Sequence, residues 1–330
     1  MTTVGVIGAG AWGTVIANMF AENGHDVRLW CYKESIAHQI AHNKRHHRLP
    51  EVVLSSELTT TTQLSDCYDA DVVILGLSSS QLTAYDKVIE WKKIQSPILF
   101  LAKGIIEPEW FISDWLEQRF LGDIAVLSGP NLALEIAQKK PSASVVASKN
   151  STVAFYIQDL LSNHYFRVYT SNDIRGVQCG GIFKNVFAIA AGCIDGLKLG
   201  DNAKAALITR GMMELKRISS FFGADDSTIW GLSGLGDLIA TCGSKQSRNW
   251  QLGNEVVTNP NRTEWESDVR GQTEGIRTIR LLLKRMMNES LNLPIMMSVG
   301  RLFQDQNASP QKIIQDLMER GLKSEFDQSI

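Results

Sequence analysis

The chain has 330 residues, of which 44% are hydrophobic and 21% charged, and its formal net charge at pH 7 is −2. This balance is typical of a globular protein of about two domains, and it provides no electrostatic basis for binding nucleic acid or an anionic membrane. No apolar run approaches the roughly 20 residues that span a bilayer. The first residues lack the basic segment of a signal peptide. We therefore expect a cytoplasmic protein without stable membrane insertion.

The cysteine and histidine patterns argue against a disulfide framework and against a metal site. The five cysteines are an odd, scattered set without a C-x-x-C pair, which favours reduced thiols. His42 and His46 lie four residues apart, but cations surround them and no carboxylate or cysteine stands beside them. We predict a solvated basic loop over residues 42–48, whose charge could help to attract a phosphate-bearing ligand, and no metal site.

A glycine-rich turn near the N-terminus is the strongest functional motif. Gly8-Ala9-Gly10-Ala11-Trp12-Gly13 follows the apolar run Val4–Ile7 and precedes a helical pattern over Thr14–Glu22. Such a strand, turn and helix bind the pyrophosphate of a dinucleotide, because the glycines permit a tight turn and close backbone approach. The free N–H groups at the helix start then receive the anion. The alternative is a glycine-rich turn without a ligand.

The first half alternates strand and helix patterns, which predicts a doubly wound parallel sheet of the Rossmann type. Parallel strands are buried on both faces and read as continuous apolar runs, and ligands bind at their carboxyl ends. The predicted strands cover Val4–Ile7, Asp26–Tyr32, Asp71–Leu77, Pro97–Ala102, Ile124–Leu127, Ser144–Ala147 and Phe166–Thr170.

The second half carries helical patterns over Ile182–Cys193, Ala203–Phe222 and Gly275–Met287 and no strand pattern. We therefore expect an α/β fold with two domains. Residues 1–176 form the dinucleotide-binding Rossmann domain, and residues 177–330 form an all-helical domain that binds substrate and carries catalysis.

Lys184 and Asp237 are the sharpest candidates for catalysis. Lys184 lies in a helix that is apolar on nearly every face, with no acid three or four residues away. An unpaired ammonium buried there would be costly, which favours either a lowered pKa or a polar cleft, and so a general acid or base. The alternative is a lysine that snorkels to the surface. Asp237 follows a glycine-rich segment, where it would either cap a helix or orient Lys184 or a substrate hydroxyl.

Three further segments carry groups suited to phosphates and strand-end ligands. Ser247-Arg248-Asn249 clusters donors around an arginine whose planar fork can bind two oxygens of a phosphate or carboxylate, or it is a solvated loop. Lys103 and the segment Ser128–Asn131 both follow predicted strands, at the carboxyl edge where cofactor and substrate meet.

The end of the second strand bears on the choice of cofactor. NAD enzymes commonly place an acid there for the ribose hydroxyl. Here the strand ends in Trp30-Cys31-Tyr32-Lys33-Glu34, and Lys33 could pair with a 2′-phosphate. We expect NADP, with NAD kept open because Glu34 follows closely.

The chain resembles NAD(P)-dependent glycerol-3-phosphate dehydrogenases of the bacterial type along nearly its whole length. The resemblance rests on the segments Gly8–Thr14, Lys103-Gly104, Ser128–Pro130, Cys179–Gly192, Asp195-Gly196, Gly200–Gly211, Gly234–Leu238, Thr241-Cys242 and Ser247–Asn249. It implies reversible reduction of dihydroxyacetone phosphate to sn-glycerol 3-phosphate, a phospholipid precursor, on a Rossmann domain followed by a helical domain, usually in a homodimer.

The resemblance also implies residue roles. Lys184 would be the general acid or base, and Lys103 and Asp237 would hold Lys184 and the substrate oxygen. The substrate-binding set is Lys103, Gly129, Asn131, Lys184, Asn185, Asp237, Thr241, Ser247, Arg248 and Asn249. The cofactor-binding set is Gly8, Gly10, Ala11, Trp12, Gly13, Tyr32, Lys33, Arg48, Lys103, Ala133, Arg248, Gln272 and Glu274.

The departures from the family pattern concern affinity and cofactor preference. Ala11 stands where a serine is usual, Asn131 where serine or threonine is usual, Gln272 where an apolar residue is usual, and Tyr32 where histidine or arginine is common. None of them removes a proposed catalytic group. Two other functions stay open at this point: a dehydrogenase of similar architecture for a hydroxy acid or sugar acid, and a non-catalytic nucleotide-binding protein.

Overall fold

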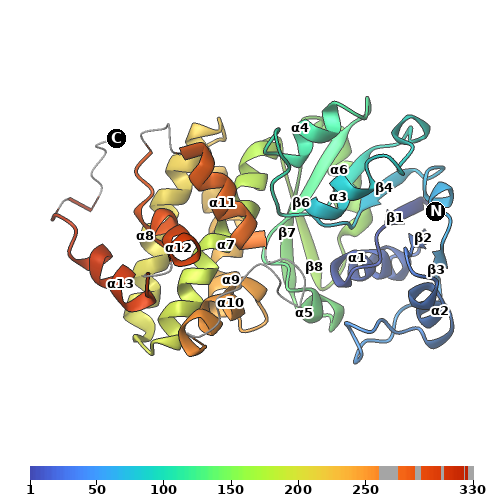
Figure 1. Ribbon diagram of the computed structural model, residues 1–330. Helices are drawn as coiled ribbons and strands as arrows, with labels where there is room; N and C mark the ends of the chain where they lie inside the picture. Colours follow the sequence, from blue (N-terminus) through green and yellow to red (C-terminus); the bar gives the residue numbers. More distant parts are fainter. Residues whose placement is uncertain (260–273, 287–290, 306–307, 323, 326–330) are drawn as a thin grey trace. The chain divides into compact units, whose positions relative to one another are not determined.

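The computed structural model describes residues 1–259, 274–286, 291–305, 308–322 and 324–325 (Figure 1). The chain divides into two compact units, Met1–Gln178 and Cys179–Ile330. The first unit alternates strands and helices, and the described residues of the second unit form helices only.

The first unit is built on one eight-stranded sheet in the order β3-β2-β1-β4-β5-β6-β7-β8. Its strands are β1 (Thr3–Ile7), β2 (Asp26–Trp30), β3 (Leu58–Thr61), β4 (Val72–Leu75), β5 (Ile98–Phe100), β6 (Ile124–Ser128), β7 (Ser142–Ser148) and β8 (Phe166–Ser171). The doubly wound sheet is confirmed, with one correction. β7 runs antiparallel to β6 and pairs Ala125 with Ser148, whereas every other neighbouring pair is parallel.

Helices cover this sheet between the strands. They are α1 (Ala11–Glu22), α2 (Glu34–Asn43), α3 (Ser79–Tyr85), α4 (Ile112–Glu117), α5 (Ala133–Ala137) and α6 (Ser151–Leu161), with short 3₁₀ turns η1 (Leu64–Cys67) and η2 (Trp91–Lys93). Helix α1 starts at Ala11, three residues before the predicted Thr14, so the glycine turn leads directly into it.

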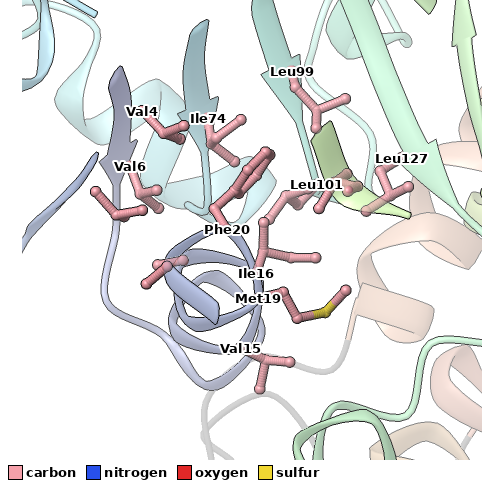
Figure 2. Close-up of a cluster of buried hydrophobic side chains, with 14 of the residues drawn as sticks. Val4, Val6, Val15, Ile16, Met19, Phe20, Ile74, Leu99, Leu101 and Leu127 are labelled. Atoms are coloured by element: carbon pink, nitrogen blue, oxygen red, sulfur yellow. The ribbon is translucent and has the colours of Figure 1, made fainter. Parts of the chain in front are cut away.

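The packing of α1 on the sheet fixes the position of the glycine turn. Figure 2 shows Ile16 and Phe20 of α1 directed at apolar side chains of the sheet region, and Val15 and Met19 belong to the same buried cluster. The sheet side of this cluster comprises Val4, Val6, Ile74, Leu99, Leu101 and Leu127. Burying each such side chain contributes about 1.5–3 kcal/mol. This packing fixes the position of α1 on the sheet and keeps the N-terminus of the helix at the carboxyl end of β1.

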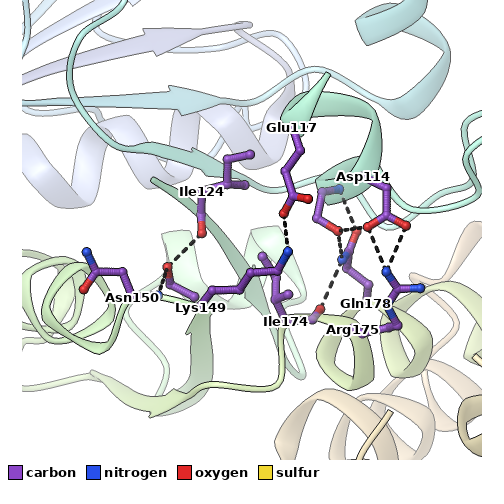
Figure 3. Close-up of polar contacts among 10 residues, drawn as sticks. Asp114, Glu117, Ile124, Lys149, Asn150, Ile174, Arg175 and Gln178 are labelled. Carbon is purple, nitrogen blue, oxygen red and sulfur yellow. Dashed lines mark hydrogen bonds and ion pairs between the residues drawn. The ribbon is translucent and has the colours of Figure 1, made fainter. Parts of the chain in front are cut away.

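Helix α7 (Ile174–Gly196) starts in the first unit, where polar contacts hold its first turn against α4 (Figure 3). Arg175 places Nη2 3.0 Å from both carboxylate oxygens of Asp114. The buried Gln178 donates from Nε2 to Ser113 Oγ at 2.8 Å and accepts from the Ser113 backbone N–H at 3.2 Å. These hydrogen bonds fix the first turn of α7 against α4 within the first unit.

The second unit contains the rest of α7 and further helices. They are α8 (Gly200–Phe221), α9 (Asp237–Gly243), α10 (Arg248–Thr258), α11 (Glu274–Met286), α12 (Pro294–Gln304) and α13 (Pro310–Met318), with a 3₁₀ turn η3 (Thr228–Trp230) and a π turn η4 (Leu232–Gly236). The three predicted helical stretches fall within α7, α8 and α11, apart from terminal residues: Phe222 lies just beyond α8, and Met287 lies outside the described residues.

Among the described residues, α7 alone is long and apolar enough to cross a membrane. It is 94% buried over its apolar window, as the core helix of a globular protein would be.

Two glycines let α7 and α10 cross at backbone contact. A Cβ at Gly192 would lie 2.0 Å from the Trp250 carbonyl oxygen, and one at Gly253 would lie 1.9 Å from the Ile189 carbonyl oxygen. No side chain larger than hydrogen fits at either position. The close crossing brings the N-terminal turn of α10 beside the middle of α7.

Glu214 of α8 caps a helix inside the second unit. Its buried carboxylate accepts backbone N–H bonds from Ile295 at 2.6 Å and Met296 at 3.0 Å, at the start of α12. Burial raises the pKa of Glu214 to about 7, although both hydrogen bonds act in the opposite direction. The charge state of this carboxyl is therefore coupled to the stability of the second unit.

Candidate cofactor and catalytic residues

The glycine turn of the first unit is built so tightly that side chains are excluded from it. Gly8 has φ of +117°, a conformation that favours glycine. A Cβ at Gly13 would lie 2.2 Å from the Gly8 carbonyl oxygen, and one at Gly76, after β4, would lie 2.8 Å from the same atom. The turn, the start of α1 and the end of β4 thus pack backbone against backbone.

The start of α1 fits the anionic group of a dinucleotide. Gly10 is the N-cap residue and makes no side-chain cap bond, and no acidic residue stands in the first turn. The first N–H groups of the helix are left without intrahelical acceptors, and the helix dipole favours a negative charge there. A Cβ at Gly10 would meet only the Gly76 carbonyl oxygen, at 3.9 Å, among protein atoms. The indole Nε1 of Trp12 is buried and has no hydrogen-bond partner among the described residues.

Positive side chains gather where β2 ends. Burial lowers the pKa of His47, and the charges of Arg48 and Lys33 lower it further, so each of these two cations lies near His47. Lys33 is the N-cap residue of α2. Tyr32 is exposed and its ring packs edge-on against Tyr85 at 5.7 Å. Lys33 and Arg48 could therefore hold a 2′-phosphate.

The prediction of a solvated basic loop over residues 42–48 is wrong in two respects: His42, although exposed, is helical, and His46 is buried. His42 belongs to the last turn of α2. His46 is 0% exposed, and its Nε2 lies 3.0 Å from the carbonyl oxygen of Ala9 in the glycine turn. The sequence pattern does not indicate a buried histidine, because the neighbours of His46 in sequence are cations. The contact that accompanies its burial is non-local and involves Ala9. No group of three potential metal ligands occurs among the described residues.

The ends of β5 and β6 bring three predicted residues of the first unit together. Lys103 donates from Nζ to the Gly129 carbonyl oxygen at 2.8 Å, and Gly129 has φ of +153°. Asn131 donates from Nδ2 to Ser144 Oγ at 3.1 Å, and its Oδ1 is buried without a partner among the described residues. Ala133, a predicted cofactor contact, is the first residue of α5. Ser144 was not predicted, and its hydroxyl in turn donates to the Ser128 carbonyl oxygen at 2.8 Å.

In the second unit, Lys184, Asp237 and Thr241 form one buried cluster. Lys184 is 7% exposed, and its Nζ donates to Asp237 Oδ1 in an ion pair and to Thr241 Oγ1 at 2.8 Å. Thr241 donates its own proton to the Asp237 carbonyl oxygen at 2.6 Å. The two alternatives, a snorkelling lysine and a capping aspartate, are therefore wrong: Gly236 is the N-cap of α9, and Asp237 pairs with Lys184.

Glycines position this cluster. A Cβ at Gly180, one helical turn before Lys184, would lie 2.3 Å from the Ser233 carbonyl oxygen in η4. A Cβ at Gly234 would lie 1.9 Å from the Ile229 carbonyl oxygen. The π turn therefore rests directly on α7, and α9 begins at the level of Lys184.

Two asparagines form a second polar contact next to the lysine. Asn249 donates from Nδ2 to Asn185 Oδ1 at 2.8 Å and accepts the Gly275 N–H at 3.1 Å. This places Glu274, the first residue of α11, close to the start of α10. Ser247 caps α10 by accepting the Trp250 N–H at 3.2 Å, and the exposed Arg248 is the first residue of that helix. Gln272 lies outside the described residues.

Two surface cavities lie apart from the predicted site residues, and the cysteine thiols are buried, in the part of the chain that the structure describes. A cavity of about 620 Å³ is lined by residues such as Tyr68 and Lys93, and one of about 490 Å³ by residues such as Gln158 and His164. Neither cavity includes a predicted site residue. All five cysteines are buried, and burial raises the pKa of Cys31, Cys67, Cys193 and Cys242 to about 12, which makes these thiols poor nucleophiles.

Comparison with known proteins identifies the family. Sequence models of the NAD-dependent glycerol-3-phosphate dehydrogenase N-terminus and C-terminus match residues 3–154 and 173–315. The chain is 37% identical to glycerol-3-phosphate dehydrogenase [NAD(P)+] of Oceanobacillus iheyensis, covering 99% of this chain and 96% of the relative. It is also 37% identical to the enzyme of that name from Trichormus variabilis, with 99% of each covered. The crystal structure of glycerol-3-phosphate dehydrogenase from Coxiella burnetii is similar, with a TM-score of 0.87 and 31% identity over 97% of this chain and 99% of that one. The chain therefore belongs to the NAD-dependent glycerol-3-phosphate dehydrogenase family.

Proposed function

We propose that this protein catalyses the reversible NAD(P)H-dependent reduction of dihydroxyacetone phosphate to sn-glycerol 3-phosphate, which supplies phospholipid synthesis. The observation that carries the proposal is the buried Lys184–Asp237–Thr241 cluster, since the second unit pairs one lysine with a carboxylate and a hydroxyl there. Membership of the family makes the substrate and the reaction the natural assignment for that cluster.

The first unit would bind the cofactor. Its glycine turn, where Gly10 makes no side-chain cap bond at the start of α1, suits the pyrophosphate, and Lys33 and Arg48 suit a 2′-phosphate. Trp12 and Asn131 carry buried polar atoms without a partner among the described residues. Ala11 has no hydroxyl, so the pyrophosphate would depend on backbone N–H groups and the helix dipole. NADPH is our expected preference over NADH. When bound, the reduced nicotinamide supplies a hydride to the carbonyl carbon of the substrate.

Lys184 would supply the proton. As the carbonyl becomes an alkoxide, negative charge develops on its oxygen, and an ammonium aimed at that oxygen stabilises the charge and donates the proton. Asp237 would keep the lysine charged, because a neighbouring carboxylate favours the ammonium form. Thr241 would restrict the direction of Nζ. In the reverse direction, the neutral amine would accept the proton from the alcohol.

Arg248 would bind the substrate phosphate at the start of α10. It is exposed, it presents a planar fork of donors, and it sits at a helix N-terminus where the dipole favours anions. Asn185 and Asn249 would extend this polar surface toward Lys184. Binding energy gained at the phosphate, remote from the reacting bond, would serve to position the carbonyl.

The remaining assignments follow from the family resemblance. Lys103, held at the Gly129 carbonyl, would add positive potential for the substrate oxygen. Residues 1–176 would hold the cofactor and residues 177–330 the substrate. We further propose a homodimer and a cytoplasmic location.

An oxidation assay with matched substrates tests the proposal. NADPH or NADH is mixed with the purified chain and with dihydroxyacetone phosphate or unphosphorylated dihydroxyacetone, and absorbance of the reduced cofactor is followed. We expect turnover with the phosphorylated ketone and a much lower kcat/KM without the phosphate. Turnover only with a keto acid or sugar acid would instead indicate the alternative dehydrogenase. Cofactor binding without turnover on any of these substrates would indicate a non-catalytic nucleotide-binding protein.

A further inference from the structure

The buried ring of His46 makes one contact from each nitrogen, and both contacts involve backbone atoms of the first unit. Nε2 lies 3.0 Å from the Ala9 carbonyl oxygen, and the backbone N–H of Arg48 donates to Nδ1 at 3.2 Å. The side chain is 0% exposed. One aromatic ring therefore connects the glycine turn to the segment that carries Arg48.

The two contacts determine the tautomer of the ring. A backbone N–H can only donate, so Nδ1 must carry a lone pair. A carbonyl oxygen can only accept, so Nε2 must carry the hydrogen. The ring that satisfies both is neutral. Burial lowers the pKa of His46 to about 4, and the neighbouring charges of His47 and Arg48 also lower it, while the bond to Ala9 acts in the opposite direction.

The bond to Ala9 sets the orientation of the following N–H group. The peptide between Ala9 and Gly10 is planar, and in a trans peptide the carbonyl and the N–H point in opposite directions. Holding the Ala9 carbonyl on His46 therefore aims the Gly10 N–H away from the ring. Gly10 is the N-cap of α1, where the pyrophosphate would bind.

The hydrogen bond from the Arg48 N–H to His46 fixes the backbone of a turn over residues 46–49. His46 also accepts the Leu49 N–H on its own carbonyl at 2.8 Å, so residues 46–49 form a closed turn. Leu49 is buried in the core of the first unit. With its N–H on the ring, the backbone of Arg48 is fixed within this turn, while the charges of Arg48 and of Lys33 both act on His47.

We propose that His46 is a positioning residue of the cofactor site, which through its two ring nitrogens orients the glycine turn toward the pyrophosphate and Arg48 toward the 2′-phosphate. This inference rests on the proposed cofactor role of the first unit. It assigns two separable effects to one side chain, one that acts on both cofactors and one that acts on NADPH alone.

Two substitutions separate the effects. His46→Asn can place an amide oxygen near the position of Nδ1, which keeps an acceptor for Arg48 and loses the donor to Ala9. His46→Gln can place an amide nitrogen near the position of Nε2, which keeps the donor and loses the acceptor. Dissociation constants for NADH and NADPH are measured by fluorescence titration of each purified variant. The thermal midpoint, and kcat at saturating cofactor, are measured in parallel.

We expect His46→Asn to weaken both cofactors by about tenfold, the effect of one lost neutral hydrogen bond. We expect His46→Gln to weaken NADPH by a similar factor and to leave NADH within about twofold of the unaltered chain. In both variants kcat at saturating cofactor should stay close to that of the unaltered chain. Unchanged dissociation constants, or equal weakening of both cofactors by both variants, would overturn the proposal. Failure of the unaltered chain to bind either cofactor would overturn the proposed function itself.

A measurement on the unaltered chain covers the case in which neither variant folds. In a ¹⁵N spectrum of the histidine rings, His46 should show a protonated Nε2 and an unprotonated Nδ1 throughout the neutral pH range. Saturating NADPH should shift these ring signals while the tautomer stays the same. A charged ring, an Nδ1–H tautomer, or no response to the cofactor would contradict the assignment.

Discussion

The two units present their functional groups by different means. In the first unit the candidate cofactor site is made largely of backbone: glycines at positions 8, 10 and 13, the carbonyl of Gly129, and N–H groups at the start of α1. In the second unit the candidate catalytic groups are buried side chains that satisfy one another, Lys184 with Asp237 and Asn185 with Asn249.

The difference predicts opposite sensitivities to substitution. A backbone site fails when an atom is added, because the added Cβ occupies space that a ligand or another carbonyl needs. A side-chain site fails when an atom is removed, because the remaining partner is left buried and unpaired. Variants that add or remove few atoms can therefore test each unit separately.

Removal of the lysine should have the largest effect. We expect Lys184→Ala to lower kcat for dihydroxyacetone phosphate by about 10²–10⁴-fold, the usual contribution of a general acid, because no other group would donate the proton. The dissociation constant for NADPH should stay unchanged, since the first unit binds it. Steady-state kinetics and fluorescence titration provide the two values. Lys216→Ala, at a partly exposed lysine of α8, is the control, and near-normal turnover of Lys184→Ala would reject the role of Lys184.

Added methyl groups should distinguish two glycines of the same turn. Gly13→Ala places a Cβ 2.2 Å from the Gly8 carbonyl oxygen, so we expect a lower thermal midpoint together with loss of cofactor binding. Gly10→Ala meets protein only at 3.9 Å, so the midpoint should stay within a few degrees while the cofactor binds at least about tenfold more weakly, the effect of a loss of about 1.4 kcal/mol. Calorimetry and titration separate the two effects. Unimpaired binding by Gly10→Ala would show that the pyrophosphate does not approach this turn.

The phosphate contact should give a smaller effect, confined to the substrate. We expect Arg248→Ala to raise KM for dihydroxyacetone phosphate by about 10- to 100-fold, as loss of a charge-assisted hydrogen bond would, with little change for unphosphorylated dihydroxyacetone. Arg301→Ala, at an exposed arginine of α12, serves as the control. An unchanged KM in a folded Arg248→Ala variant would argue against phosphate binding by Arg248.

The most gradual predicted effect is a pH dependence of stability with opposite signs in the two units. His46 has a lowered pKa of about 4, so its contribution is present above pH 6.5 and is lost as the pH falls toward 4. Glu214 has a raised pKa of about 7, so its contribution is present below pH 4.5 and is lost as the pH rises through 7. Each effect amounts to at most about 3 kcal/mol.

Thermal midpoints between pH 4.5 and pH 8 measure both contributions. His46→Gln should flatten the acid side of the profile, and Glu214→Gln should flatten the alkaline side. If either variant kept the full pH dependence of the unaltered chain, the replaced side chain would not be the source of that part of the pH dependence.

The sequence predicted those parts of the fold that depend on local pattern. The strands of the first unit are short apolar runs, and the glycine turn has a fixed spacing, so both are visible within ten residues. Strand β3 was missed because its sequence Leu58–Thr61 is mostly polar. The reversed direction of β7 could not be predicted, because strand direction depends on the path of the chain between strands and not on the composition of either strand.

The candidate site was predictable as residue types and not as contacts. Lys184 stood out because a lysine in an apolar helix requires a partner, but that partner, Asp237, lies 53 residues away. The sequence therefore leaves two roles open for Asp237, and the start of α9 on α7 decides between them. His46 was misjudged for the same reason: its neighbours in sequence are cations, whereas its contact in space is the carbonyl of Ala9, 37 residues earlier.

The central claim is that the Lys184–Asp237 pair donates the proton, and the pH profile of kcat/KM for dihydroxyacetone phosphate reduction tests it most directly. The profile is measured for the unaltered chain and for Asp237→Asn, which keeps the shape of the side chain and removes its charge. Because the carboxylate favours the charged lysine, the account predicts that the alkaline limb moves to lower pH in Asp237→Asn and that the rate at neutral pH falls. An unchanged profile at a normal rate would contradict the account.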